Sequence, residues 1–134
     1  MSSNNDSGEV KDPNDTNTNL ADLRQVMGAF VGERDWEQFH SPKNLAMSIA
    51  IEAAELMEHF QWLDVDQSRS VSPDQIQQIS EELADVLCYG LALANQLEID
   101  LTRSILHKME KNREKYPADQ FRGRFGYSDS KPID

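Results

Sequence analysis

The sequence predicts an all-α protein in which four helices form a bundle, and three observations support this fold class. Apolar residues recur every three or four positions in four segments of the chain, as they do in amphipathic helices. Two of these segments begin with Ser-Pro, at residues 41–42 and 72–73, and serine followed by proline is a typical helix start. Residues 48–62 contain neither Gly nor Pro and are rich in Ala, Leu, Met and Glu, which are good helix formers.

The folded part is expected to be one domain over residues 19–117, an ordinary size for a single core. Residues 1–18 are rich in Ser, Asn, Asp and Thr and contain little that can be buried, so we expect a disordered tail. Residues 118–134 are polar and contain Gly, which predicts a flexible C-terminal tail. Phe121, Phe125 and Tyr127 are the side chains of this tail that can dock on the folded part.

The first predicted helix covers residues 20–35, with Asn19 as its N-cap. Its apolar face consists of Leu20, Leu23, Val26, Met27 and Phe30. Residues 36–40 then form a connection rich in aromatic side chains, whereas short connections are mostly polar.

The second predicted helix covers residues 42–61 and carries an acidic stripe. At about 100° per residue, Ser48, Glu52, Glu55 and His59 fall within a sector roughly 60° wide. Apolar residues flank this sector on both sides, which an ordinary solvated face does not show. A polar loop is expected over residues 64–72.

The third predicted helix covers residues 73–97, and Ser72 with Gln75 forms a capping box at its start. Glu82, Asp85 and Tyr89 share one face of this helix, and apolar residues share the opposite face. At about 1.5 Å per residue the helix is roughly 37 Å long, more than a small domain usually spans. Either it projects or another subunit covers it, and we expect a homo-oligomer.

The fourth predicted helix covers residues 101–115, with Asp100 as its cap and a Tyr-Pro pair at its end. Lys108, Asn112 and Lys115 lie on one border of its apolar edge. Such side chains are ordinary on a solvated helix face. Ammonium and amide donors beside a metal site would also suit a polyphosphate.

The second and third helices each offer two carboxylates three residues apart, Glu52 with Glu55 and Glu82 with Asp85. If the helices pack side by side, four negative charges converge and repel one another unless a cation lies among them. A site made only of carboxylates favours Mg²⁺, with Mn²⁺ as an alternative, over zinc. A di-iron bundle would need Glu-x-x-His on two helices; His59 lies four residues after Glu55, and the third helix has no His.

The competing interpretation is a non-catalytic helical module for oligomerisation or interaction. Acids on helices commonly face water and pair with Lys or Arg. In that case the acids only solvate the module or bind Ca²⁺. The shortage of basic residues on the two acidic faces argues against this interpretation.

Composition disfavours several partners. The net charge of -11, from 24 acidic and 13 basic residues, disfavours binding to nucleic acid or to an anionic membrane. The single cysteine, Cys88, cannot form an intramolecular disulfide and is expected to be a small core residue. The beginning of the sequence lacks the pattern of a signal peptide, and no apolar run is long enough to span a membrane. We expect a cytoplasmic protein.

Aromatic side chains near the acidic faces are candidates for binding a base. Trp62 and Tyr89 lie beside or on the acidic stripes, where a flat ring can stack on a nucleobase. Trp36, Phe39 and His40 equally suit packing in a core or an interface.

These motifs resemble the MazG-like superfamily of all-α nucleoside triphosphate pyrophosphohydrolases. The resemblance rests on Glu-Ala-Ala-Glu-Leu over residues 52–56 and Glu-Glu-Leu-Ala-Asp over residues 81–85. Within the superfamily the dCTP pyrophosphatase branch is similar at Glu-Arg-Asp-Trp-Glu-Gln-Phe-His (33–40), Phe-Gln-Trp (60–62) and residues 108–117. The similarity covers roughly residues 20–117.

The resemblance implies a MazG-like bundle that assembles as a dimer or a tetramer. It also implies cleavage of a deoxynucleoside triphosphate, first of all dCTP or a modified dCTP, to the monophosphate and pyrophosphate, which would cleanse the nucleotide pool. The Mg²⁺ ligands would be Glu52, Glu55, Glu82 and Asp85, and Glu52 or Glu55 would take a proton from the attacking water. The substrate contacts would be Trp36, His40, Trp62, Tyr89, Lys108 and Asn112.

One residue departs from the dCTP branch, whose animal members carry a base-contacting His where this sequence has Met27. A methionine offers a soft apolar wall and no side-chain donor. We therefore expect the width of the base-binding slot to favour deoxypyrimidine triphosphates over purine ones. Discrimination among pyrimidines should be weaker than a His at position 27 would give. Trp36 and Trp62 flank the acidic helix and are expected to reach the same mouth of the bundle.

Overall fold

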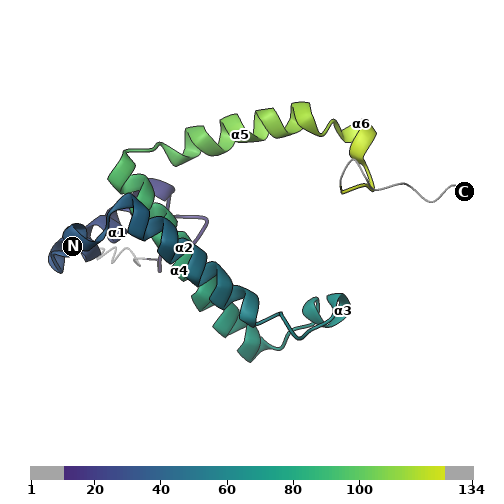
Figure 1. The fold of residues 1–134 in the computed structure, drawn as a ribbon, viewed down its shortest axis with the longest axis horizontal. Helices are drawn as coiled ribbons and strands as arrows, with labels where there is room; N and C mark the ends of the chain where they lie inside the picture. The colour runs from purple at the N-terminus through teal and green to yellow at the C-terminus, as the bar shows by residue number, and fades with distance from the viewer. Residues whose placement is uncertain (1–10, 126–134) are drawn as a thin grey trace, which may run out of the picture. The chain divides into compact units, whose positions relative to one another are not determined.

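The computed structural model describes residues 11–125, which are helical apart from short connections (Figure 1). The helices in chain order are α1 (Leu20–Glu33), the 3₁₀ helix η1 (Trp36–Phe39), α2 (Pro42–Glu58), α3 (Val65–Ser68), α4 (Pro73–Leu97), α5 (Leu101–Lys115) and α6 (Ala118–Phe121). No strand occurs among these residues, so the predicted all-α fold class is confirmed. None of the helices within residues 11–125 combines the length and apolar character needed to cross a membrane.

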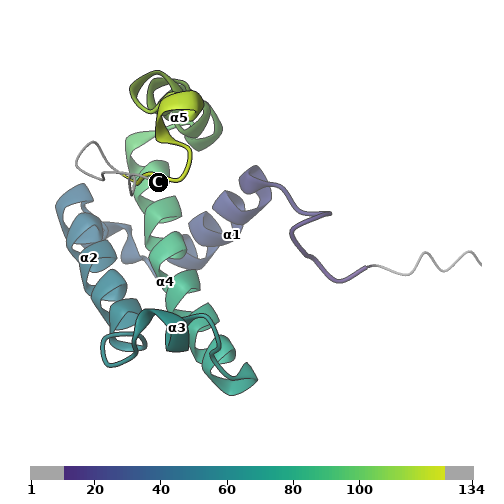
Figure 2. The same cartoon turned by 90° about the vertical axis from the view of Figure 1, so that its right-hand side faces the viewer.

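The chain divides into two compact units, Met1–Leu97 and Glu98–Asp134, and each is described by itself. In the first unit α2 runs alongside α4, and α1 packs against α4 and η1 (Figure 2). The four long predicted helices correspond to α1, α2, α4 and α5. A single domain over residues 19–117 stays a prediction.

Side-chain caps fix the starts of the long helices where the sequence predicts them. The Asn19 side chain accepts a hydrogen bond from the Asp22 amide at 2.9 Å, and the Asp22 carboxylate accepts one from the Asn19 amide at 3.1 Å. Ser72 and Gln75 exchange the same pair of bonds at 3.2 and 2.8 Å. Ser41 caps α2, whose first residue is a proline. These bonds satisfy amides that a helix start leaves without intrahelical partners.

Two helices end earlier than predicted. α1 ends at Glu33, because Asp35 has a φ of 53°, in the left-handed region that does not continue a right-handed helix. α2 ends at Glu58 rather than at residue 61. The Phe60 amide bonds to the Met57 carbonyl at 2.9 Å, three residues back, which is turn geometry rather than α-helical geometry.

The segment after α2 is not only a loop, because α3 forms within it. The Asp64 side chain accepts a hydrogen bond from the Gln67 amide at 2.7 Å, and the Gln67 side chain accepts one from the Asp64 amide at 3.0 Å. This capping box starts one helical turn. The prediction of a loop over residues 64–72 was therefore wrong at Val65–Ser68.

The core of the first unit is small. Its buried apolar side chains are Val31, Leu45, Ala92 and Ala94, of which Leu45 is only 1% exposed. Several large apolar side chains of α2 and α4 are instead more than two-fifths exposed. They are Met47, Ile51, Met57, Ile76, Leu83 and Leu87. The flank of the acidic stripe that carries Met47 and Ile51 is thus left largely uncovered within this unit, whereas Leu45 on the other flank is buried.

The second unit contains α5 and α6. Asp100 caps α5 by accepting a hydrogen bond from the Arg103 amide at 2.9 Å, as predicted. The rings of Tyr116 and Phe121 pack edge to face with centroids 5.2 Å apart. Phe121, one of the tail residues expected to dock, therefore packs on the end of the predicted fourth helix.

The predicted tails lie partly outside the described residues, which exclude 1–10 and 126–134 and therefore Tyr127. Residues 11–18 are almost entirely exposed and contain one turn, in which the Asn17 side chain accepts a hydrogen bond from the Asn14 amide at 2.7 Å. In the C-terminal segment α6 forms within a stretch predicted to be flexible.

Candidate metal centre and adjoining pocket

An acidic cluster forms where α2 and α4 run side by side. Glu52 of α2 meets Glu82 and Asp85 of α4, and each offers a carboxylate oxygen within 4.8 Å of the others. The spacing of three residues places Glu82 and Asp85 on the same face of α4. The predicted convergence of acids from two helices is therefore present in the geometry.

Glu55, the fourth predicted acid, lies beside this group of three. Burial is the largest cause that raises the pKa of Glu52 and of Glu82, and Glu55 is the neighbouring acid that adds most to it. Four carboxyl groups from two helices thus lie close enough to repel one another when all of them are charged.

Burial and mutual repulsion raise the pKa values of two members. The pKa of Glu52 rises from its ordinary value of 4.5 to about 7, first through burial, then through the hydrogen bond and charge of Glu55, with Asp85 and Glu82 adding repulsion. Burial also leads the causes that raise the pKa of Glu82, followed by the charge and hydrogen bond of Glu55. His59 acts in the opposite direction on Glu82. The fully charged cluster is thus unfavourable by itself.

The cluster contains buried oxygen atoms that lack a hydrogen-bond partner within residues 11–125. Oε2 of Glu52 and Oε2 of Glu82 are both buried without a hydrogen-bond partner among the described residues. Buried polar atoms are normally paired, and an orphaned one calls for a specific explanation such as an ion. A set of carboxylate oxygens suits a hard divalent cation such as Mg²⁺ or Mn²⁺. The residues present therefore fit a divalent metal ion.

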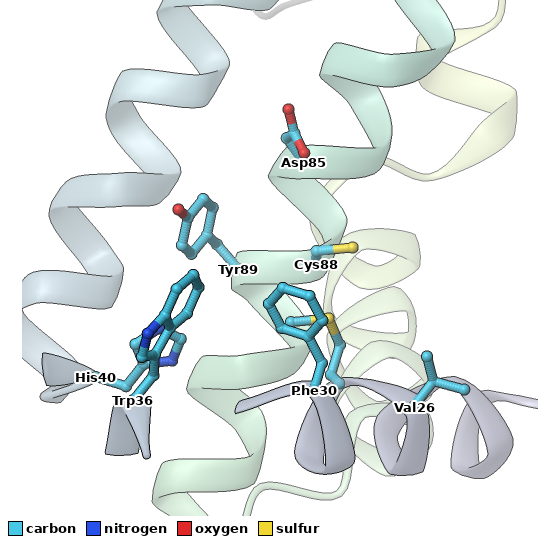
Figure 3. Close-up of a pocket in the computed structure, with 8 residues that line it drawn as sticks. Val26, Phe30, Trp36, His40, Asp85, Cys88 and Tyr89 are labelled. Atoms are coloured by element: carbon cyan, nitrogen blue, oxygen red, sulfur yellow. The ribbon is translucent and has the colours of Figure 1, made fainter. Parts of the chain in front are cut away.

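A pocket of about 340 Å³ adjoins the cluster, and Asp85 belongs to both (Figure 3). The pocket is lined by Val26, Met27, Phe30, Trp36, His40, Asp85, Cys88 and Tyr89, which come from α1, η1, the residue after η1, and α4. Figure 3 shows Trp36 and Tyr89 on one side and Phe30 on the other. The rings of Phe30 and Trp36 pack edge to face at 5.5 Å between centroids.

The structure brings together three of the predicted substrate contacts: Trp36, His40 and Tyr89 all line the pocket. Met27 lines it too, as expected if it faces the slot. The aromatic connection contacts α1, and its residues Trp36 and His40 line the pocket together with residues of α4.

Trp62 does not line this pocket, which corrects one prediction. Trp36 precedes α2 and Trp62 follows it, so the two indoles lie toward opposite ends of a 17-residue helix. Such a helix is about 25 Å long. The expectation that both tryptophans reach one mouth of the bundle is therefore wrong within a single chain, and Trp62 is 87% exposed.

The remaining predicted contacts, Lys108 and Asn112, lie on α5 in the second unit. Lys108 is exposed, and the Asn112 amide contacts the Met109 sulfur at 3.9 Å. Their roles stay predictions.

Sequence reasoning missed three lining residues: Val26, Phe30 and Cys88. The sequence places Val26 and Phe30 on the apolar face of the first helix. In the structure this face lines a pocket and not an enclosed core. Cys88 was expected in the core, but it is half-buried in the pocket wall, and burial followed by the charge of Asp85 raises its pKa. Its spacing of three residues from Asp85 was the available signal, because it places both on one face of α4.

The fold and the acidic cluster define an all-helical protein with a candidate divalent metal centre beside an apolar pocket. The sequence profile of the MazG-like family matches residues 47–125, which include the four acids. The chain belongs to the MazG-like family.

Individual relatives agree with this assignment. The chain is 42% identical over 106 residues to dCTP pyrophosphatase 1 of Rattus norvegicus, covering 78% of this chain and 62% of that protein. It is 44% identical over 101 residues to dCTP pyrophosphatase 1 of Homo sapiens, covering 74% of this chain and 59% of that protein. The chain thus spans about three-fifths of the length of these relatives. A crystal structure of a pyrophosphatase from Archaeoglobus fulgidus superposes with a TM-score of 0.70 at 38% identity, covering 81% of this chain and 99% of that one.

Proposed function

We propose that this protein is a Mg²⁺-dependent nucleoside triphosphate pyrophosphohydrolase. Its substrate would be a deoxynucleoside triphosphate, dCTP or a modified dCTP first, and its products the monophosphate and pyrophosphate. One observation carries the proposal: Glu52, Glu82 and Asp85 bring carboxylate oxygens within 4.8 Å of one another, and Asp85 also lines an aromatic pocket. The names of the relatives, which are dCTP pyrophosphatases, support the choice of reaction and base.

The pocket supports binding of a nucleobase. Small-molecule sites are mostly apolar cavities of roughly 300 to 1,000 Å³ with a few polar groups, and this one has a volume of about 340 Å³. Trp36 offers a ring on which a base can stack, and His40 and Tyr89 offer groups that can hydrogen-bond to it. The base would occupy this pocket while the phosphates lie toward the acids.

The four acids Glu52, Glu55, Glu82 and Asp85 would hold the metal. A bound divalent cation supplies positive charge to the phosphate oxygens and makes a nearby water more acidic. Glu52 or Glu55 would accept the proton of that water as it attacks the α-phosphorus. Lys108 and Asn112 would donate hydrogen bonds to the phosphates.

We further propose a homo-oligomer, a dimer or a tetramer. The apolar residues on α2 and α4, such as Ile51 and Leu87, are 56% and 60% exposed, and an exposed apolar patch of this kind marks an interface. Since Trp62 cannot reach the pocket of its own chain, its proposed contact with the base would be made to a second copy. The expected cytoplasmic location stays a prediction.

Pyrophosphate release tests the proposal. The full chain is incubated with dCTP and Mg²⁺, and products are separated by ion-exchange chromatography, with EDTA and the Glu55→Gln variant as controls. We expect dCMP and pyrophosphate with Mg²⁺ and neither product with EDTA. Absence of hydrolysis across a panel of nucleoside triphosphates would favour the alternative, a non-catalytic acidic helical module for oligomerisation or interaction.

A further inference from the structure

His59 lies directly after α2, one helical turn beyond Glu55, and faces the acidic cluster. Its Nε2 atom is 3.8 Å from Oε1 of Glu82. Both side chains are only about a quarter exposed, at 25% and 26%. The proposed reaction gives this histidine no role.

The two oxygens of Glu82 have different surroundings. Oε1 faces the imidazole of His59, whereas Oε2 is buried and has no hydrogen-bond partner within residues 11–125. A carboxylate is planar, so a group that holds one oxygen also fixes the direction of the other. Oε2 of Glu82 is therefore the oxygen that is available to a cation.

His59 brings a nitrogen donor to the edge of this cluster. The sequence contains no Lys or Arg between Lys43 and Arg69, and none follows until Arg103. Neither α4 nor the part of α2 that carries the acids therefore supplies an ammonium or guanidinium group. A histidine with hydrogen on Nε2 can serve as a donor in its neutral form.

We propose that His59 is a positioning residue that holds Oε1 of Glu82 and thereby directs Oε2 of Glu82 into the metal centre. This inference rests on the proposed metal site and adds a residue to it. The separation of 3.8 Å is roughly 1 Å longer than a hydrogen bond, so the contact is electrostatic in the metal-free protein. Closer approach of the two side chains by that distance would give a hydrogen bond.

The expected effect is on metal binding. Partners that orient a ligating carboxylate typically contribute 10- to 100-fold to metal affinity. His59→Leu and His59→Ala remove the donor and should weaken Mn²⁺ binding by about that factor. His59→Gln keeps an amide donor at a similar reach and should restore most of the affinity. Glu58→Gln changes an exposed residue next to His59 and serves as the matched control.

The test measures free Mn²⁺ by electron paramagnetic resonance during titration of each full-length variant, without nucleotide. Steady-state kinetics then add a second readout: the donor-free variants should need more Mg²⁺ for half-maximal rate and approach the wild-type kcat at saturating Mg²⁺. Circular dichroism checks that each variant is folded. Two donor-free variants are included so that the test can still be made if one of them does not fold.

Wild-type Mn²⁺ affinity in a folded donor-free variant would overturn the inference. Equal losses in His59→Gln and His59→Leu would overturn it as well, because the role would then be structural. The proposed function is tested separately. A wild-type protein that binds Mn²⁺ but releases no pyrophosphate from any nucleotide would contradict the proposed hydrolase activity. The Mn²⁺ titrations would still test the role of His59.

Discussion

Arg24 of α1 and Asn95 of α4, 71 residues apart in the sequence, exchange two hydrogen bonds. The Arg24 Nε donates to Oδ1 of Asn95 at 2.9 Å, and Nδ2 of Asn95 donates to the Arg24 carbonyl at 3.1 Å. The pair is partly buried and ties α1 to α4, the two helices that supply most of the pocket wall. The link therefore helps to hold α1 in place against α4.

Replacing Asn95 by Ala should loosen the pocket. Loss of both bonds at a partly buried site should lower the free energy of unfolding by about 1 to 3 kcal/mol. KM for dCTP should rise more than kcat falls, because the acids on α2 and α4 stay in place. Urea unfolding and steady-state kinetics measure the two effects, with Gln96→Ala, an exposed neighbouring amide, as the control. Unchanged stability and KM would contradict the role of the link.

Neutralising one acid should separate activity from stability. Glu55→Gln or Asp85→Asn should abolish hydrolysis and weaken Mg²⁺ binding, because each removes a charge from the cluster. The metal-free variants should melt at the same or a higher temperature than the wild type, since the removed charge relieves repulsion. Differential scanning calorimetry in EDTA and a hydrolysis assay give both values. Near-normal turnover by either variant would refute the assigned metal site.

The metal-free protein should become less stable as the pH rises from about 4.5 to about 7. The pKa of Glu52 is about 7 in the folded protein and 4.5 ordinarily, so over this range the folded state binds more protons than the unfolded state. Stability falls with pH wherever the folded state holds the extra protons. Melting temperatures in EDTA across this range measure the slope.

The control for this pH effect is Glu52→Gln, which cannot titrate and should show a shallower slope. Glu82, whose pKa is also raised, should keep part of the effect in that variant. An identical slope in the wild type and in Glu52→Gln would show that Glu52 does not carry the raised pKa.

The protein should not be a monomer in solution. Its uncovered apolar side chains on α2 and α4 need a partner surface, and a second copy supplies one with closed symmetry. Light scattering at micromolar concentration should give a multiple of the chain mass, 15.3 kDa. Ile51→Glu, which places a charge in the exposed apolar surface, should lower that mass. A wild-type mass near 15.3 kDa would rule out the oligomer.

Substrate choice should depend on Trp36 and Met27, which both line the pocket. Stacking of a base on an aromatic ring contributes roughly 1 to 3 kcal/mol, so Trp36→Ala should lower kcat/KM for dCTP by about one to two powers of ten. Met27→His adds a donor to the wall and should sharpen discrimination among pyrimidines.

The measurement is kcat/KM for dCTP, dTTP, dUTP, dATP and dGTP with the wild type and both variants. Phe39→Ala is the control, because Phe39 belongs to η1 but does not line the pocket. A wild type that prefers purines, or a Trp36→Ala enzyme unchanged on dCTP, would contradict this description of the pocket.

The helices were predictable because their signals are local. Asn19 and Ser72 lie three residues from the partners that complete their caps, and the acids lie three residues apart on one helix face. The short helix α3 carried the same kind of signal at Asp64 and Gln67, but polar residues around it favoured a loop.

The pocket was only partly predictable because it depends on contacts between distant segments. Periodicity places Phe30 on an apolar face, but whether that face is enclosed depends on how α1 crosses α4, which the distant pair of Arg24 and Asn95 helps to fix. The separation of Trp36 from Trp62 was available in the sequence, because the predicted helix over residues 42–61 already lies between them.

α4 carries both halves of the candidate site within two turns, from Glu82 in the acidic cluster to Tyr89 in the pocket. Seven residues of helix correspond to about 10 Å along the axis, and the backbone hydrogen bonds of the helix keep that length constant. The proposed site therefore selects a substrate by its dimensions as well as by its chemistry. A nucleoside without phosphates, or pyrophosphate without a base, would fill one end and leave the other open to water.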